Sequence, residues 1–213
     1  MFGACAGSEH SQGGSKGLSV FCVDPGETTG WAWACVSYRE LRSIGGGSGG
    51  SGGDLSWGSL FARLIDSGRF DCGQVEVYRG PLSSSSVAAR VAMQEAMACV
   101  DLSVTIEQLH ILTQGVSRGS VSQVTDIVIE DFILRQGTKA RNLLAPVRLT
   151  AGLVQEVLRS NRLIGVTMQS PSDAKSVVTD DRLRSLGLWQ VGQVHARDAC
   201  RHLALFLRRL VAE

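Results

Sequence analysis

The chain has little net charge, few aromatic residues and no long apolar run. Its 213 residues carry a formal charge of +1, and only 6% of them are aromatic. A charge balance this close to zero does not by itself indicate a nucleic-acid partner, and no apolar stretch is long enough to cross a bilayer. No amino-terminal signal peptide is recognisable either. We therefore expect a cytoplasmic protein of one domain, with no membrane partner and enough residues to bury a core.

Cysteine motifs are absent as well. The six cysteines, at positions 5, 22, 35, 72, 99 and 200, include no Cys-x-x-Cys pair and no spacing typical of a metal site. They lie in apolar strand-like or helical patterns where the position is informative, which predicts small buried hydrophobic residues rather than metal ligands.

The distribution of charge along the chain is uneven. Residues 1–131 hold 8 Lys and Arg against 14 Asp and Glu, a net charge of −6, whereas residues 132–213 hold 13 against 6, a net charge of +7. An acidic half that supplies carboxylates, followed by a basic half, fits an enzyme that acts on a polyanion.

Gly/Ser-rich stretches mark the organisation of the chain. Residues 1–17 are predicted to form a flexible tail, and residues 45–53 (GGGSGGSGG) a flexible linker, natural or engineered, within one domain at 18–213. Periodicity predicts strands at 18–23, 31–36 (with an extension to 39 left open), 74–78, 124–129 and 162–168, and helices at 60–65, 87–100, 103–115, 143–161, 172–176, 180–185 and 195–211.

These elements predict the fold class. An antiparallel start followed by β-α-β units indicates an α/β fold with a mixed β-sheet flanked by helices. Residues 162–168 are expected to form a core strand, and the last helix is expected to bury Ala199, Leu203, Phe206 and Leu210.

Residues 18–34 (LSVFCVDPGETTGWAWA) contain the first candidate site residue. A strand-like apolar run ends at Asp24, a turn is expected at 25–30, and a second apolar run begins at Trp31. An acid at the end of a buried strand, beside backbone amides and two hydroxyl groups, is typical of a metal or phosphate site. An Asp before Pro-Gly also caps turns in many hairpins, so Asp24 alone leaves both interpretations open.

Further acids lie at the ends of other core elements. Glu130 closes the strand at 124–129, and a shift of one residue in register would exchange its role with that of Asp131. Asp198 lies one turn into the last helix, three residues after His195, so the two side chains share a helix face. An acid near a helix start also favours the helix dipole, which is the structural alternative for Asp198. His202 is expected to be a packed neighbour.

Carboxylates gathered from separate strands repel one another unless cations neutralise them. Two divalent ions about 4 Å apart would activate a water molecule and stabilise the leaving oxygen of a phosphodiester. Oxygen ligands with one imidazole suit Mg²⁺ or Mn²⁺ better than zinc.

Basic residues follow the strand that ends at Glu130. Arg135, Lys139 and Arg141 are either a solvated loop or a site that holds DNA backbone phosphates, and Lys175 is a weaker candidate of the same kind.

Three motifs resemble the RuvC-type Holliday junction resolvases. VFCVDPGETTGWA is similar to their first strand and turn, VIVIEDF to their strand-borne glutamate, and HARDACRHLALFLRR to their last helix; APVRLTAGL and QSPSDAK resemble phage-encoded members in particular. The resemblance implies an RNase H-like fold with a five-stranded sheet, a homodimer in the cytoplasm of a bacterial host, and Mg²⁺-dependent nicking of four-way DNA junctions. It also implies that Asp24, Glu130, His195 and Asp198 form the catalytic and metal-ligating set, with His195 as a ligand or a general base.

Other functions compete with this one. A related nuclease that cuts RNA–DNA hybrids, flaps or forks would share the same acids, and a catalytically silent DNA-binding relative would share the fold. The segment after Asp24 also resembles the first phosphate loop of actin-like and sugar-kinase ATPases, but the chain has neither the length nor the internal repeat that those proteins need.

Overall fold

The computed structural model describes residues 17–45, 52–77, 91, 93–99, 124–131, 144–159 and 164–212. Four predicted features lie wholly or mostly outside these ranges: the tail, most of the linker, the helix at 103–115 and the basic loop that contains Arg135, Lys139 and Arg141. The first strand begins at Gly17.

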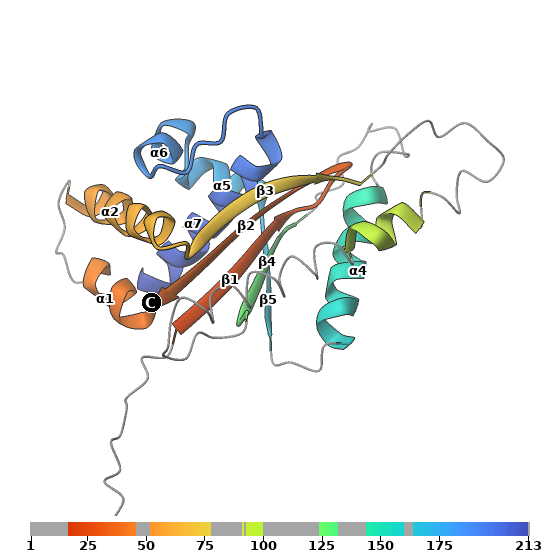
Figure 1. The fold of residues 1–213 in the computed structure, drawn as a ribbon, viewed down its shortest axis with the longest axis horizontal. Coiled ribbons are helices and arrows are strands. Elements are labelled where there is room, and N and C mark those ends of the chain that lie inside the picture. The colour runs from red at the N-terminus through yellow and green to blue at the C-terminus, as the bar shows by residue number, and fades with distance from the viewer. Residues whose placement is uncertain are drawn as a thin grey trace, which may run out of the picture.

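Five strands form one sheet (Figure 1). In chain order they are β1 (Gly17–Asp24), β2 (Thr28–Ser37), β3 (Phe70–Glu76), β4 (Asp126–Glu130) and β5 (Gly165–Gln169), and their order across the sheet is β3-β2-β1-β4-β5. β2 is antiparallel to both of its neighbours, whereas β1 pairs with β4, and β4 with β5, in parallel. The structure therefore confirms the predicted α/β fold with a mixed five-stranded sheet.

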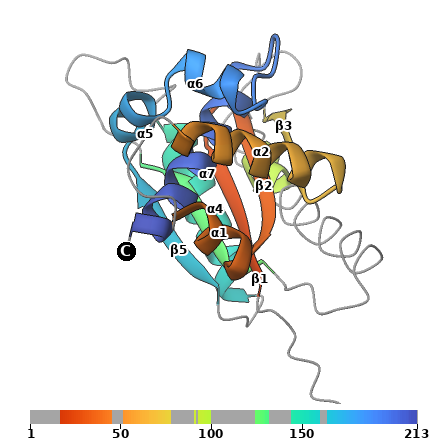
Figure 2. The ribbon, with the colours of Figure 1, turned by 90° about the vertical axis from the view of Figure 1, so that its left-hand side faces the viewer.

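Helices cover both faces of the sheet (Figure 2). One face carries α1 (Tyr38–Gly45), α2 (Gly52–Asp66), α5 (Pro171–Val177), α6 (Asp180–Ser185) and α7 (Val194–Ala212); the other carries α4 (Leu144–Arg159) and the helical residues 93–99. Val20 and Cys22 of β1 pack on the α7 face, and Phe21 and Val23 on the α4 face. A strand that is covered on both faces is mostly apolar, which explains the apolar run at residues 20–23 that precedes Asp24.

The helix α7 packs across β1 and β2 and carries most of the predicted buried stripe. Ala199, Leu203 and Phe206 are buried as predicted. Leu210 is 36% exposed, contrary to the prediction, because it lies in the last turn of the helix, where the neighbouring residues also face solvent.

The second strand starts earlier than predicted, and the extension to residue 39 that the sequence left open does not form. Thr28 to Gly30 belong to β2 rather than to the turn, and the strand stops at Ser37 because α1 begins at Tyr38. Ser37 and Glu40 cap this helix reciprocally: the Glu40 backbone N–H donates to Ser37 Oγ over 3.2 Å, and the Ser37 N–H donates to Glu40 Oε2 over 2.9 Å. This Ser-x-x-Glu box was the sequence signal that the strand interpretation overlooked.

The strand β5 is an edge strand, so the prediction of a core strand at 162–168 is wrong. Val166 is 43% exposed and Met168 is 44% exposed. β5 has a single neighbour, β4, and only Gln169 at its end is buried. Its apolar residues could not distinguish an edge position from a central one, because that distinction depends on which strands pair.

Candidate functional site

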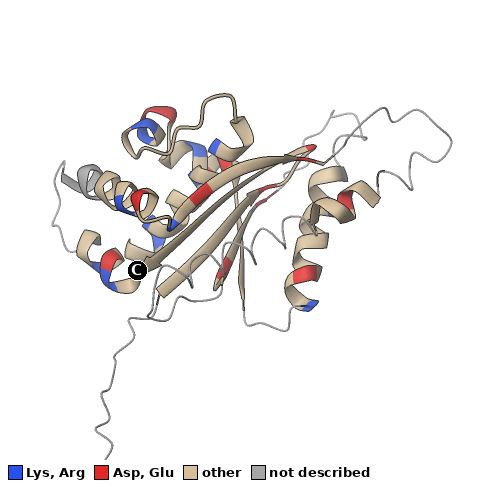
Figure 3. Cartoon of the chain, viewed as in Figure 1, with Lys and Arg blue, Asp and Glu red and all other residues tan. Residues whose placement is uncertain are grey.

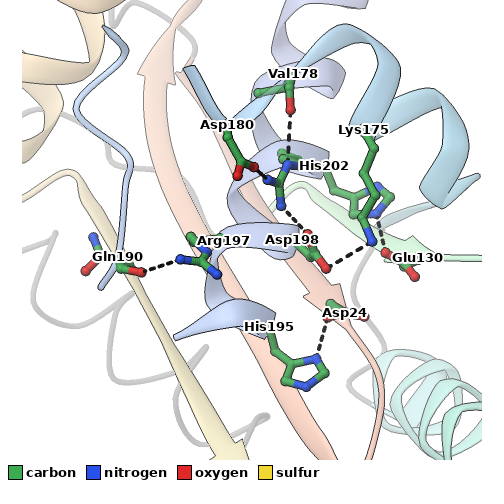
Figure 4. Close-up of polar contacts among 11 residues, drawn as sticks. Asp24, Glu130, Lys175, Val178, Asp180, Gln190, His195, Arg197, Asp198 and His202 are labelled. Carbon is green, nitrogen blue, oxygen red and sulfur yellow. Dashed lines mark hydrogen bonds and ion pairs between the residues drawn. The ribbon is translucent and has the colours of Figure 1, made fainter. Parts of the chain in front are cut away.

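The predicted acids come from separate strands that end at the same edge of the sheet. β1 and β4 are parallel, and Val23 lies opposite Ile129. Asp24 and Glu130 are the next residues of these strands, so they lie side by side at the two strand ends. The first turns of α7 bring His195 and Asp198 to this edge, where the close-up shows all four side chains in one group (Figure 4). The predicted catalytic set is therefore assembled in space.

The start of α7 reaches this edge because Gly30 leaves room for it. Gly30 pairs with Asp24 in the β1–β2 ladder. A Cβ atom built on Gly30 would lie 2.0 Å from the His195 carbonyl oxygen and 2.7 Å from the Ala196 nitrogen. Only glycine permits such a close approach of helix backbone to strand backbone. Gly30 was predicted to be a turn residue, and its role in seating α7 was missed.

Asp24 and His195 form the first acid–base pair of the site. His195 Nδ1 lies 2.8 Å from Asp24 Oδ2, and Asp24 is only 7% exposed. Burial raises the pKa of the Asp24 carboxyl; the hydrogen bond from His195 opposes this, and the nearby charges of Glu130 and Asp198 raise the pKa further. The same hydrogen bond raises the pKa of His195 against the opposing effect of burial.

Glu130 faces the site, and Asp131 does not. Glu130 Oε2 lies 2.8 Å from Nε2 of His202, and Nδ1 of His202 lies 3.0 Å from Oε1 of Gln169 at the end of β5. Asp131 is exposed, and its backbone N–H donates to the Gln169 carbonyl oxygen over 2.7 Å. The register that the sequence left open therefore directs the Glu130 side chain to α7.

Asp198 is held by two cations of the chain. Arg201, one turn along α7, donates to Asp198 Oδ1 and also to Asp180 at the start of α6, and its Nε donates to the Val178 carbonyl oxygen over 3.1 Å. The Lys175 Nζ atom of α5 lies 3.3 Å from Asp198 Oδ2. Figure 3 shows further Lys and Arg residues on α5 and α6, the helices that precede α7. Lys175, predicted to bind DNA, therefore lies at the acid cluster itself.

The described side chains do not form a preorganised metal-binding site. Within the described residues, no three His, Cys, Asp or Glu side chains are arranged so that they could hold a metal ion. Each acid instead contacts a nitrogen base of the chain, and α7 supplies one for each: His195 for Asp24, His202 for Glu130 and Arg201 for Asp198. The sequence predicted that divalent cations would neutralise these acids; in the structure the side chains of α7 and α5 provide partners for them.

The chemistry of the donors nevertheless suits a hard divalent cation. Carboxylate oxygens with one imidazole are the ligands that Mg²⁺ and Mn²⁺ accept. The charges of Glu130 and Asp198 contribute to the raised pKa of Asp24, so the three carboxylates are close enough to repel one another. A divalent cation between them would relieve that repulsion.

Three residues of the site were not predicted from the sequence. His202 was expected to be a packed neighbour, and Arg201 and Gln169 were not singled out. His202 shares a helix face with Asp198 and His195, which was the available signal for it. Nothing local marks Gln169, because its contact with His202 depends on the pairing of β5 with β4.

Two further predictions concern the surroundings of the site. Arg135, Lys139 and Arg141 lie outside the described residues, so their contribution to DNA binding stays a prediction. Among the helices that the structure describes, none combines the length and the apolar character needed to cross a membrane.

Comparisons with known proteins gave matches only among solved structures. No family model matches the chain, and no curated protein sequence matches it. A structure of Thermus thermophilus RuvC in complex with a Holliday junction substrate matches 91% of this chain and 96% of its own, at 10% identity and a TM-score of 0.49. A structure of T. thermophilus RuvC alone matches 91% of this chain and 98% of its own, at 13% identity and a TM-score of 0.47.

Proposed function

We propose that the chain is a divalent-metal-dependent endonuclease that cuts branched DNA, with the four-way junction as its substrate. One observation carries the proposal: Asp24, Glu130 and Asp198, from two parallel strands and a helix, meet at one edge of the sheet with a histidine on the innermost acid. Burying several mutually repelling acids costs stability, and such an arrangement is typical of an active site.

The metal of the proposed site is Mg²⁺ or Mn²⁺, bound as two ions. Asp24, Glu130, His195 and Asp198 are the residues that would hold them. When bound, the ions would activate water and stabilise the leaving oxygen of the scissile phosphodiester.

His195 has a second task in the proposed site. Its Nδ1 atom is bonded to Asp24, and its side chain is 41% exposed. A carboxylate on Nδ1 favours the tautomer in which the other nitrogen, Nε2, carries the free lone pair. We propose that Nε2 of His195 either binds the metal or accepts the proton of the attacking water.

Lys175 supplies positive charge where the phosphate would lie. Its side chain is 55% exposed although its ammonium contacts Asp198. A flexible ammonium group at the edge of an acid cluster can release its carboxylate partner and bind a DNA phosphate instead, at little free-energy cost. With Arg135, Lys139 and Arg141, it would hold the DNA backbone without reading its sequence.

Paired cuts in a four-way junction need two active sites, so we propose a homodimer. The α4 side of the sheet carries four apolar side chains that are at least half exposed: Met93, Met97, Val147 and Leu158. Because contiguous apolar patches are typical of interaction surfaces, we propose that these four side chains form the dimer contact. Analytical ultracentrifugation of Leu158→Glu should show a weakened dimer, whereas Val191→Glu, an exposed site in the loop before α7, should leave it intact.

The cleavage test uses a synthetic four-way junction and a linear duplex of the same sequence, each with Mg²⁺ or with EDTA. We expect symmetric, Mg²⁺-dependent nicks in the junction only. Glu130→Gln should lose cleavage, and its exposed neighbour Asp131→Asn should keep it. Equal cutting of the duplex would contradict junction selectivity, and cleavage of an RNA–DNA hybrid, flap or fork alone would identify a related nuclease.

A second candidate function is a catalytically silent DNA-binding protein. The contacts of Asp198 with both Arg201 and Lys175 favour it, because an acid that is fully engaged by cations is a poor metal ligand. Tight junction binding without any cleavage, in Mg²⁺ and in Mn²⁺, would support this candidate over the nuclease.

A further inference from the structure

His202 is buried inside the site and uses both of its ring nitrogens. It is 1% exposed, in the third turn of α7. Its Nε2 atom lies 2.8 Å from Glu130 Oε2, and its Nδ1 atom lies 3.0 Å from Oε1 of Gln169, which is itself 2% exposed. Figure 4 shows the ring next to the Glu130 carboxylate, away from the Asp24–His195 pair. A chain of three side chains thus links β5, α7 and β4.

The direction of the hydrogen bond to Glu130 follows from chemistry. An ionised carboxylate only accepts hydrogen bonds, so Nε2 of His202 carries the proton and donates. The Gln169 side chain can offer either its oxygen or, after a half-turn of its amide, its nitrogen to Nδ1. In both orientations Nε2 remains the donor to Glu130.

Burial fixes the position of the His202 ring relative to Glu130. Both strand ends are fixed, because Glu130 and Gln169 are paired residues of β4 and β5. The ring contacts both of them and is shielded from solvent. By contrast, the side chain of His195 at the rim is 41% exposed. The two histidines of the site therefore differ: His195 reaches the surface, whereas His202 is buried and hydrogen-bonded to Glu130.

We propose that His202, held by Gln169, is a positioning residue that fixes the orientation of the Glu130 carboxylate towards the other acids. The role of Glu130 rests on the proposed function, but the hydrogen bond does not. A partner behind a ligating carboxylate fixes which oxygen faces the metal, and its loss typically lowers metal affinity or activity by about 10- to 100-fold.

Three variants separate positioning from packing. His202→Leu fills the space without a donor, and His202→Gln keeps an N–H close to the place of Nε2. Leu207→Ala is the matched control, because Leu207 is fully buried on the same helix and belongs to the apolar core on the α7 face of the sheet. The readouts are Mn²⁺ binding to the DNA-free protein by calorimetry, melting temperature, and kcat and KM on the four-way junction.

We expect His202→Leu to weaken Mn²⁺ binding by about tenfold and to lower kcat by about 30-fold with KM nearly unchanged. His202→Gln should recover both values to within about fivefold of wild type, and Leu207→Ala should melt earlier with Mn²⁺ binding unchanged. Equal Mn²⁺ binding in wild type and His202→Leu, or no recovery in His202→Gln, would overturn the proposal.

A spectroscopic measurement keeps this inference distinct from the proposed function. In the metal-free protein, the Nε2–H proton of His202 should give a protected imidazole NMR signal that shifts in Glu130→Gln and stays in place in Asp131→Asn. If this signal does not shift in Glu130→Gln, the positioning role is overturned even if the wild type cuts junctions. Failure of the wild type to cut any nucleic acid, with the signal responding to Glu130, would overturn only the proposed function.

Discussion

Two carboxyl groups of this protein have similar hydrogen bonds and opposite pKa shifts. Glu40, at the start of α1, accepts from Arg69 at both oxygens, over 2.9 and 3.0 Å, and the bond to Arg69 lowers the pKa of Glu40 to about 2. Asp24 is bonded to His195 over 2.8 Å, yet burial raises its pKa.

The difference lies in what surrounds each pair. Glu40 is partly exposed, and its neighbours are an arginine and the capping Ser37, all of which favour the charged form. Asp24 is nearly covered, and its other neighbours are two more acids. Glu40 therefore stabilises the fold, whereas Asp24 costs stability. A buried carboxylate whose charged form is destabilised, such as Asp24, is the stronger candidate for a functional residue.

The largest effect is expected for Asp24→Asn. It should lower the rate of junction cleavage by about 1,000-fold or more, because it removes a ligand and the partner of His195. Because burial penalises the charged form of Asp24, the variant should also melt at a higher temperature than wild type at pH 7. A gel cleavage assay and a thermal melt measure the two effects, and a large drop in melting temperature would contradict the contrast with Glu40.

Gly30→Ala tests the contact that builds the acid region. The new methyl group would meet the His195 and Ala196 backbone, so we expect a loss of about 3 kcal/mol in the free energy of unfolding, measured in urea. Gly68→Ala is the matched control: Gly68 has a φ of 65° with open space around it, so backbone strain alone should cost about 1 kcal/mol. Equal losses in both variants would show that α7 is not seated on Gly30.

Glu40→Gln tests the other region and should leave cleavage unchanged. At pH 7 we expect a loss of about 1 kcal/mol of stability, because the pair is only partly buried. The pKa of Glu40 is lowered in the folded state, so its contribution is present above about pH 4.5 and is lost as the pH falls towards 2. Urea unfolding of both proteins from pH 7 to 2.5 should show the difference shrinking over that range; a constant difference would contradict the assignment to ionised Glu40.

Removal of metal should have the smallest effect on the fold. Because His195, His202, Arg201 and Lys175 already partner the acids, EDTA should change the melting temperature by no more than about 2 °C. Added Mg²⁺ or Mn²⁺ should raise it in wild type by mass action and not in Asp24→Asn. A collapse in EDTA would instead mean that the acid region depends on bound cations.

Much of the fold could be predicted because its signals are local. The unbroken apolar run before Asp24 indicated a strand covered on both faces, and α6 occupies the predicted range 180–185. The wrong predictions concern properties that neighbours decide. The edge position of β5 depends on which strands pair, and the end of β2 depends on a cap that competes with strand pairing.

The same division holds for the site. Local sequence patterns indicate which acids and histidines lie at strand ends and on one helix face. Asp24, Glu130, His195 and Asp198 could therefore be named as candidates from the sequence. Only the tertiary structure decided which partner each acid has, that Glu130 and not Asp131 faces α7, and that Gly30 seats the helix. Periodicity determines which face of an element a side chain occupies, but hydrogen bonds between distant segments depend on how the sheet and α7 pack together.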